Sequence, residues 1–275
     1  MKLLVSVVDH EEAAAALGGG ADIIDAKDPA RWPLGAVSIA VLRQISATVN
    51  EARPVTAALG DAADEGAVER DARAYAGAGA MLVKVGLAGV AGVARATALL
   101  AAAVRGAAAG SGGLCGVVAV AYADAHRVAS PAPVVVTEAA ARVGAAGVLL
   151  DTADKDGPGL HDLLSPGALA AWVAQAHEAR LLVALAGKLG AEDFGFVRDA
   201  GADIAGVRGA ACVGGRTGRV TAEQVRALRT MSVFDEVRGC ELPPTVPDRV
   251  TRHRPRGYSG SPGAQAGRAR PSASE

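Results

Sequence analysis

Near its amino terminus the chain reads Ala21-Asp-Ile-Ile-Asp-Ala-Lys27-Asp-Pro29. The part from Asp22 to Ala26 is short and largely apolar, and it lies between a run of glycines and Asp28-Pro29, which is typical of a buried parallel strand. Asp25 and Lys27 are two positions apart, so their side chains project from the same side of an extended strand. We therefore predict a strand that carries an amine and a carboxylate to its carboxyl end, where α/β enzymes do their chemistry. A surface ion pair after a strand is the simpler alternative.

A similar pattern recurs about every sixty residues along the chain. The copies are Gly20-Ala-Asp-Ile-Ile-Asp25, Gly79-Ala-Met-Leu-Val-Lys84, Gly144-Ala-Ala-Gly-Val-Leu-Leu-Asp151 and Gly201-Ala-Asp-Ile-Ala-Gly-Val207. If each copy forms an even-numbered strand of a barrel, the side chains that end the copies can meet in one layer of the barrel centre. They include Asp25, Lys84 and Asp151, together with Arg208 directly after the fourth copy. The alternative is a general pattern of a glycine helix cap and a small residue before a strand.

Hydrophobic periodicity and turn residues predict eight strands that alternate with eight helices in residues 1–235. We expect strands at 2–8, 22–26, 54–58, 81–85, 114–121, 147–151, 181–186 and 204–207. We expect helices at 11–17, 37–48, 66–78, 90–109, 131–143, 166–179, 192–199 and 221–233. This alternation is typical of the α/β class and of a parallel sheet closed as a (β/α)8 TIM barrel. Residues 240–275 are rich in Pro, Arg, Gly and Ser without apolar periodicity, so we expect a disordered tail there.

Composition limits the classes of function. With 275 residues, 51% of them hydrophobic, and a formal net charge of -1, the chain can bury a large core but offers no general basic surface for nucleic acid or membrane. The apolar start at 1–8 is too short for a signal peptide or a membrane span, so we expect a cytoplasmic protein. The three cysteines and five histidines lack the spacing of metal ligands. Arginines in the tail could contact RNA or an acidic partner, although a solvated tail is the simpler interpretation.

Lysine is rare in this chain. Of the 28 Lys and Arg residues, five are lysine: Lys2, Lys27, Lys84, Lys155 and Lys188. Arginine keeps its proton near neutral pH and cannot act as an amine nucleophile, whereas lysine can when its surroundings lower its pKa. All but the first of these lysines fall at or just after the ends of predicted strands. We infer that they mark positions where arginine cannot substitute.

The motifs at the predicted strand ends together resemble one enzyme family. They are Leu3-Leu-Val-Ser-Val7, Gly19-Gly-Ala-Asp-Ile-Ile-Asp-Ala-Lys-Asp-Pro29, Leu34-Gly-Ala36, Val83-Lys-Val-Gly-Leu87, Ala121-Tyr-Ala-Asp-Ala-His-Arg127, Leu150-Asp-Thr-Ala-Asp-Lys-Asp-Gly157, Leu185-Ala-Gly187 and Gly206-Val-Arg-Gly-Ala-Ala-Cys212. Over residues 1–233 the chain resembles the (5-formylfuran-3-yl)methyl phosphate synthase family, also called 4-(hydroxymethyl)-2-furancarboxaldehyde-phosphate synthase. The tail has no counterpart in that family.

The resemblance implies a TIM-barrel lyase, without a cofactor or metal, that condenses two molecules of glyceraldehyde 3-phosphate into a phosphorylated furan aldehyde, with loss of one phosphate and water. It implies that Lys27 matches the lysine that forms a Schiff base with the substrate and that Lys84 matches the proton acceptor. Asp25, Asp151 and Lys155 match further charged positions of the pocket. The product is implied to supply the furan of methanofuran-type cofactors or, in some bacteria, other furan metabolites.

A phosphorylated substrate needs a phosphate clamp, which TIM barrels commonly place in the loops after the seventh and eighth strands. We expect the clamp at Gly187, Lys188, Arg208, Gly209 and Ala210, where glycines expose backbone N–H groups. The resemblance itself assigns no role to Lys188. The expected partner is a small triose phosphate, nucleic acid and membranes are not expected, and the chain could form a homo-oligomer.

Two other functions fit the same residues. A Schiff-base aldolase that acts on another sugar phosphate would use the same lysines, and analysis of the product distinguishes it. A non-catalytic barrel that binds a phosphorylated metabolite would keep Arg208 and Lys188 but would not need Lys27 as an amine. Borohydride trapping of a Schiff base distinguishes that second alternative.

Overall fold

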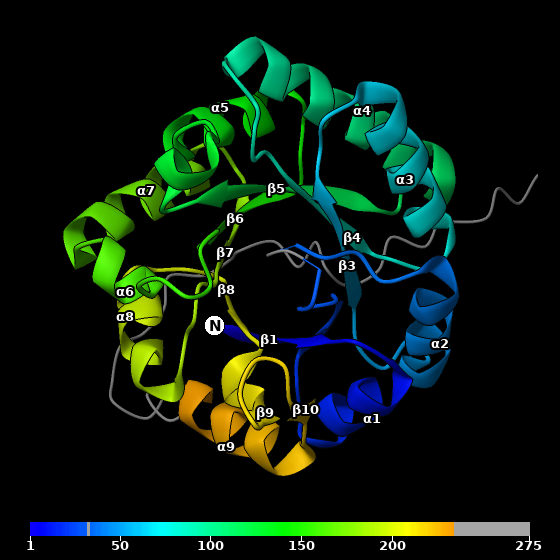
Figure 1. Cartoon of the computed structure of the whole chain (residues 1–275), viewed down its shortest axis with the longest axis vertical. Coiled ribbons are helices and arrows are strands. Elements are labelled where there is room, and N and C mark those ends of the chain that lie inside the picture. Colours follow the sequence, from blue (N-terminus) through cyan, green and yellow to red (C-terminus); the bar gives the residue numbers. More distant parts are fainter. Residues whose placement is uncertain (32–33, 234–275) are drawn as a thin grey trace, which may run out of the picture. The chain divides into compact units, whose positions relative to one another are not determined.

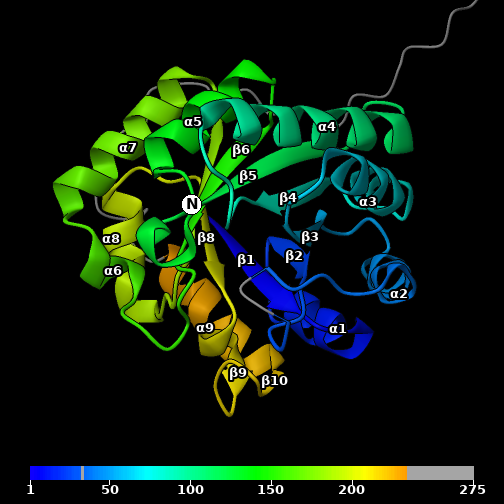
Figure 2. The ribbon, with the colours of Figure 1, turned by 45° about the horizontal axis from the view of Figure 1, so that its top comes forward.

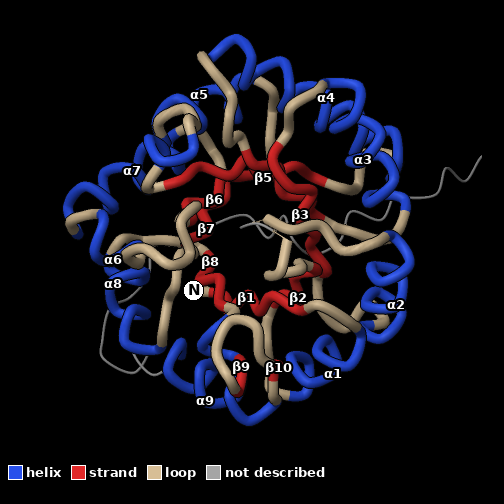
Figure 3. Tube along the Cα trace, viewed as in Figure 1, coloured by secondary structure: helices blue, strands red, loops and turns tan. Residues whose placement is uncertain are grey.

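The computed structural model describes residues 1–31 and 34–233 (Figure 1). Within them, eight parallel strands form a closed barrel that helices surround (Figure 3). The barrel strands are β1 (Lys2–Val7), β2 (Ile23–Ala26), β3 (Val55–Asp61), β4 (Leu82–Gly86), β5 (Gly116–Tyr122), β6 (Gly147–Asp151), β7 (Leu182–Leu185) and β8 (Ile204–Val207). β1 pairs with β2 on one side and with β8 on the other, which closes the sheet. The predicted (β/α)8 TIM barrel is confirmed.

The helices lie between the strands, and their bounds differ from the predicted ones by a few residues. They are α1 (His10–Gly18), α2 (Ile39–Val49), α3 (Glu65–Gly77), α4 (Val93–Ser111), α5 (Pro133–Arg142), α6 (Leu160–Leu163), α7 (Pro166–Glu178), α8 (Phe194–Asp199) and α9 (Ala222–Val233). At the start of α7, the Ser165 side chain accepts a hydrogen bond of 3.3 Å from the backbone N–H of Ala168, and Pro166 is the first helical residue. This is the helix start that the sequence predicted.

Side chains along each strand alternate between two hydrophobic cores. In β1, Leu3, Val5 and Val7 belong to the larger core between the sheet and the helices, whereas Leu4 belongs to the smaller core inside the barrel. The next inward position after Leu4 is Ser6, near the carboxyl end of the strand. The barrel interior is therefore apolar at depth and becomes polar at the end where the strands meet their following loops.

α4 has the length and hydropathy of a membrane span, but it packs closely against α3 in the outer ring. Gly106 and Gly110 make this close approach possible, because a Cβ at either position would lie 2.1 Å from the backbone oxygen of Glu69 or Arg73. The helix predicted at 90–109 is therefore part of the packed outer ring of the barrel.

The sequence did not predict α6 or a hairpin that follows β8. A 3-10 helix, η3 (Gly209–Ala211), leads into β9 (Cys212–Val213), which pairs with β10 (Arg219–Val220). Figure 2 shows this hairpin beside α1 and α9. Strands of two residues are too short to carry a periodic signal. The predicted tail at 240–275, and the predicted end of the barrel domain at residue 235, lie outside the described residues.

Candidate active site

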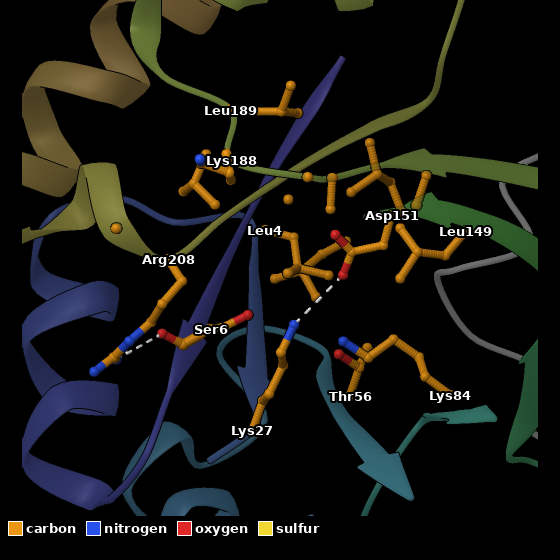
Figure 4. Close-up of a pocket in the computed structure, with 18 of the residues that line it drawn as sticks. Leu4, Ser6, Lys27, Thr56, Lys84, Leu149, Asp151, Lys188, Leu189 and Arg208 are labelled. Atoms are coloured by element: carbon orange, nitrogen blue, oxygen red, sulfur yellow. Dashed lines mark hydrogen bonds and ion pairs between the residues drawn. The ribbon is translucent and has the colours of Figure 1, made fainter. Parts of the chain in front are cut away.

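A cavity of about 340 Å³ lies at the carboxyl ends of the barrel strands (Figure 4). Apolar side chains of the barrel interior, such as Leu4 and Leu149, form part of its wall. The charged residues that line it are Lys27, Lys84, Asp151, Lys155, Lys188, Arg208 and Arg216. The barrel thus brings together the lysines that the sequence placed at separate strand ends.

Asp25 on β2 is fully buried behind this cavity and is held by side chains from three other strands, β1, β3 and β4. Its Oδ2 lies 2.5 Å from Lys84 Nζ and accepts a hydrogen bond of 2.8 Å from Ser6 Oγ. Its Oδ1 accepts a hydrogen bond of 2.7 Å from Thr56 Oγ1. Burial raises the pKa of Asp25, but the charges of Lys84 and Lys27, together with hydrogen bonds from Lys84 and Thr56, outweigh this effect and leave the pKa below its usual value. Asp25 is therefore a carboxylate near neutral pH, and it pairs with Lys84 rather than with its sequence neighbour Lys27.

Asp151, at the end of β6, contacts two lysines. Its Oδ1 lies 2.6 Å from Lys155 Nζ and accepts a hydrogen bond of 2.8 Å from the backbone N–H of Thr152. Its Oδ2 lies 3.7 Å from Lys27 Nζ, the contact drawn in Figure 4. Burial raises the pKa of Asp151, but the charges of Lys155 and Lys27, together with hydrogen bonds from Lys155 and Thr152, outweigh burial and lower the pKa to about 2.

Lys27 is the amine that these pairs surround. It is 8% exposed, and its contact with Asp151 is longer than the contact that Lys155 makes with the same carboxylate. Burial lowers the pKa of Lys27 to about 8, with Lys155 and Lys84 adding to the effect and Asp151 opposing it. A lysine with this pKa is neutral in about a tenth of the molecules at pH 7, which is enough for it to act as a nucleophile.

Comparison with known proteins places this chain in a family. A sequence model described as 4-HFC-P synthase matches residues 3–229. The chain belongs to the 4-HFC-P synthase family. A relative from Methanothermobacter thermautotrophicus, named (5-formylfuran-3-yl)methyl phosphate synthase, is 40% identical over 234 residues, which cover 84% of this chain and 98% of that protein. A relative of the same name from Methanopyrus kandleri is 44% identical over 230 residues, which cover 82% of this chain and 97% of that protein.

Solved structures share the fold of this 4-HFC-P synthase family member. The structure of 3-hexulose-6-phosphate synthase has a TM-score of 0.54 and 24% sequence identity, and the match covers 83% of this chain and 99% of that chain. Phosphoribosyl anthranilate isomerase from Thermus thermophilus has a TM-score of 0.53 and 16% identity, over 84% of this chain and 98% of that chain. At these identities the likeness shows the fold alone, and the family rests on the sequence relatives.

In this family member, the loop after β5 fixes the loop that carries Lys155. Asp124 is buried, and its two carboxylate oxygens accept hydrogen bonds of 2.7 Å and 2.8 Å from the backbone N–H groups of Ala153 and Asp154. Arg127 Nη1 lies 2.5 Å from Asp154 Oδ2. The motif at 121–127, one of those that carry the family resemblance, thus includes residues that position the loop after β6.

The loop after β7 reaches the cavity through residues predicted for the phosphate clamp. Gly187 and Lys188 both line the cavity and both have positive φ, +109° and +62°. A Cβ on Gly187 would lie 2.9 Å from Thr152 Cγ2, so this position needs glycine for space as well as for its backbone angle. The Lys188 ammonium donates a hydrogen bond of 2.6 Å to the backbone oxygen of Gly157.

Arg208 lines the cavity, but its guanidinium has other partners than a substrate. Its Nη1 donates to Ser6 O and to Glu12 Oε2, and its Nη2 donates to Glu12 Oε1 and to Gly218 O. Its Nε donates to Arg216 O. An arginine has five N–H groups, so every one is already used. In this arrangement the guanidinium of Arg208, which we expected in the phosphate clamp, has no N–H group left for a phosphate. Gly209 and Ala210 do line the cavity.

The sequence reasoning missed the partners of the predicted residues: Ser6, Thr56, Glu12 and Arg216. Ser6 and Thr56 each lie within a predicted strand, and a polar side chain on the inward face of a buried strand was the available signal. No local signal identified the other two. Among residues 1–31 and 34–233, no group of three or more His, Cys, Asp or Glu side chains is arranged to hold a metal ion.

Proposed function

We propose that this chain is a lyase that condenses two glyceraldehyde 3-phosphate molecules into (5-formylfuran-3-yl)methyl phosphate, with release of one phosphate and two molecules of water, through a Schiff base on Lys27. The observation that carries the proposal is the buried Lys27 amine, whose pKa of about 8 lies well below that of an ordinary lysine. Family membership supports the product. The arrangement of lysines around one cavity supports the intermediate.

In the first step, neutral Lys27 attacks the carbonyl carbon of one triose phosphate, and loss of water gives an imine. The imine makes the adjacent C–H acidic, which allows isomerisation, aldol addition and β-elimination of phosphate at one site. Asp151 and Lys155 lie beside the Lys27 amine and can exchange protons with the oxygen that leaves as water.

Lys84 and Asp25 form a second proton-transfer pair in this mechanism. Lys84 lines the cavity, whereas Asp25 lies behind it with both carboxylate oxygens held by protein donors. The family resemblance, rather than this ion pair, assigns Lys84 as the base that removes the acidified C–H proton. Lys84 must lose its own proton before that step, and the Asp25 charge then stabilises the ammonium group that results.

Incubation of the purified chain with glyceraldehyde 3-phosphate tests the proposal. We expect the absorbance of a conjugated furan aldehyde, the mass of its phosphate ester, and one inorganic phosphate released for each product molecule. A condensed sugar phosphate without a furan would instead identify a Schiff-base aldolase. Absence of both a product and a borohydride adduct would favour the second alternative, a barrel that binds phosphorylated metabolites without catalysis.

The pH dependence of borohydride trapping provides a second prediction. The rate of adduct formation on Lys27 should rise with pH, with a midpoint near 8. The neutral amine is the nucleophile, and its fraction increases as pH rises through the lowered pKa. Mass spectrometry of the Lys27 peptide, after trapping across about pH 6 to 10, measures this midpoint. A midpoint near that of free lysine would show that burial does not activate this amine.

Two substitutions should move this midpoint in opposite directions. Lys155→Met removes a positive charge that lowers the pKa of Lys27, so the midpoint should rise. Asp151→Asn removes a negative charge that raises it, so the midpoint should fall. We expect shifts of about one pH unit, the scale of a close charge pair. Lys2→Arg is the control, because Lys2 is exposed at the end of β1 that lies away from the cavity, and its midpoint should not change. Shifts in the same direction would contradict the assigned charge contacts.

A further inference from the structure

The loop after β8 is anchored to the start of α1 by two groups of contacts. Inside the protein, Arg208 forms an ion pair with the buried carboxylate of Glu12 and also donates to the backbone oxygens of Arg216 and Gly218. At the surface, Arg219 forms ion pairs with Asp9, at 2.5 Å, and with Glu11 of α1, at 3.0 Å. These contacts hold the stretch at 214–218 from both sides. Its position therefore depends on contacts with the first turn of α1.

This anchored loop carries Arg216 to the wall of the cavity that contains Lys27. The Arg216 side chain is partly buried, and its Nη2 atom is buried without a hydrogen-bond partner among the residues that the structure describes. A buried guanidinium nitrogen without an acceptor is costly, so its position indicates an acceptor that comes from outside the chain. The negative charge of Asp151, the carboxylate beside Lys27, also acts on the Arg216 guanidinium.

The other two cations at this end of the cavity, Arg208 and Lys188, each have partners within the protein. The guanidinium of Arg208 donates all of its N–H groups within the protein. Lys188 donates to Gly157 O at an exposed position. Arg216 is the arginine here that keeps a donor for a ligand, and a guanidinium suits a phosphoryl group because it can donate two parallel hydrogen bonds.

We propose that Arg216 binds the phosphoryl group of the triose phosphate whose carbonyl reacts with Lys27, and that the Glu12–Arg208 pair positions Arg216 for this contact. The identity of the substrate rests on the proposed function, whereas the preference of the cavity for a phosphoryl group does not. Arg216 then distinguishes phosphorylated from unphosphorylated aldehydes, and Lys27 reacts with either.

Borohydride trapping with two aldehydes tests the role of Arg216. For Arg216→Gln, the concentration of glyceraldehyde 3-phosphate that gives half-maximal trapping on Lys27 should rise about 10- to 100-fold, the effect of losing charge-assisted hydrogen bonds. The corresponding concentration for unphosphorylated glyceraldehyde should stay within about twofold, because the contact with Lys27 is unchanged. Arg216→Lys should fall between these values, since it keeps the charge without the planar fork.

The matched control is Arg142→Gln, which removes an exposed arginine from the end of α5 and should behave as the unmodified protein with both aldehydes. An equal change for the two aldehydes in Arg216→Gln, or no change for either, would overturn the phosphate assignment.

For the positioning pair, Glu12→Gln should weaken trapping of the phosphorylated aldehyde more than that of glyceraldehyde. An equal effect on both would show that the pair only supports the fold.

Failure of the proposed function can be recognised separately. If the unmodified protein traps neither aldehyde, the Schiff base on Lys27 is wrong, and titration calorimetry with inorganic phosphate then tests Arg216 alone. Weaker phosphate binding by Arg216→Gln than by Arg142→Gln would support the phosphate site. Equal binding by the two variants would overturn it.

Discussion

Replacement of Lys27 by arginine is expected to abolish borohydride trapping of glyceraldehyde 3-phosphate and to lower turnover by about 10⁴-fold or more, the scale seen when a covalent nucleophile is removed. Arginine preserves the positive charge beside Asp151 but cannot lose its proton to become a nucleophile. The measurement combines furan formation with the mass of the peptide that contains position 27.

The matched control for this variant is Lys2→Arg, which makes the same chemical change on an exposed lysine outside the cavity. It should retain turnover and trapping. A thermal melt of Lys27→Arg shows whether the loss comes from unfolding, since the larger guanidinium enters a buried site. A folded Lys27→Arg protein that is still trapped by borohydride would exclude Lys27 as the Schiff-base lysine.

Replacement of Lys84 by arginine should lower turnover by at least about 10²-fold while some Schiff base still forms on Lys27. Arginine can keep the ion pair with Asp25, but it cannot accept the C–H proton that the mechanism assigns to Lys84. The two readouts therefore separate: trapping reports the imine, and furan formation reports the proton transfer that follows it.

Lys155→Arg provides the comparison for Lys84→Arg. Lys155 lies 2.6 Å from a carboxylate whose pKa is lowered to about 2, which favours an electrostatic role that a guanidinium can partly supply. We therefore expect Lys155→Arg to keep measurable turnover. Near-normal turnover in Lys84→Arg, with only a higher KM, would instead assign Lys84 to phosphate binding.

The charges of the site form two separate groups around one amine. Asp25 and Lys84 form the first, and Asp151 and Lys155 form the second, while Lys27 makes the longest of these ion-pair contacts. Each carboxylate is buried and accepts a hydrogen bond from a neutral donor as well as a lysine. Burial has the largest effect on the pKa of Lys27, and the positive charges of Lys155 and Lys84 add to its lowering.

The sequence by itself determined the barrel and most of the charged residues of the site. A repeated glycine, small residue and apolar run, such as the run that ends in Asp25 or Asp151, specifies a buried strand locally. Parallel strands with helices between them close into a barrel whose carboxyl ends face the same side. The scarcity of lysine then marked Lys27 and Lys84 without any knowledge of their neighbours.

Only the tertiary structure decided which charges meet. Asp25 takes Lys84 as its partner instead of Lys27, because the next strands around the barrel bring that ammonium closer than the chain's own neighbour. Arg208 meets Glu12 because closure places β8 beside β1, which joins residues at opposite ends of the domain's sequence. The same closure holds Arg216 at the cavity. Strand patterns follow from local periodicity, but these contacts depend on barrel closure and on loop paths that no local periodicity encodes.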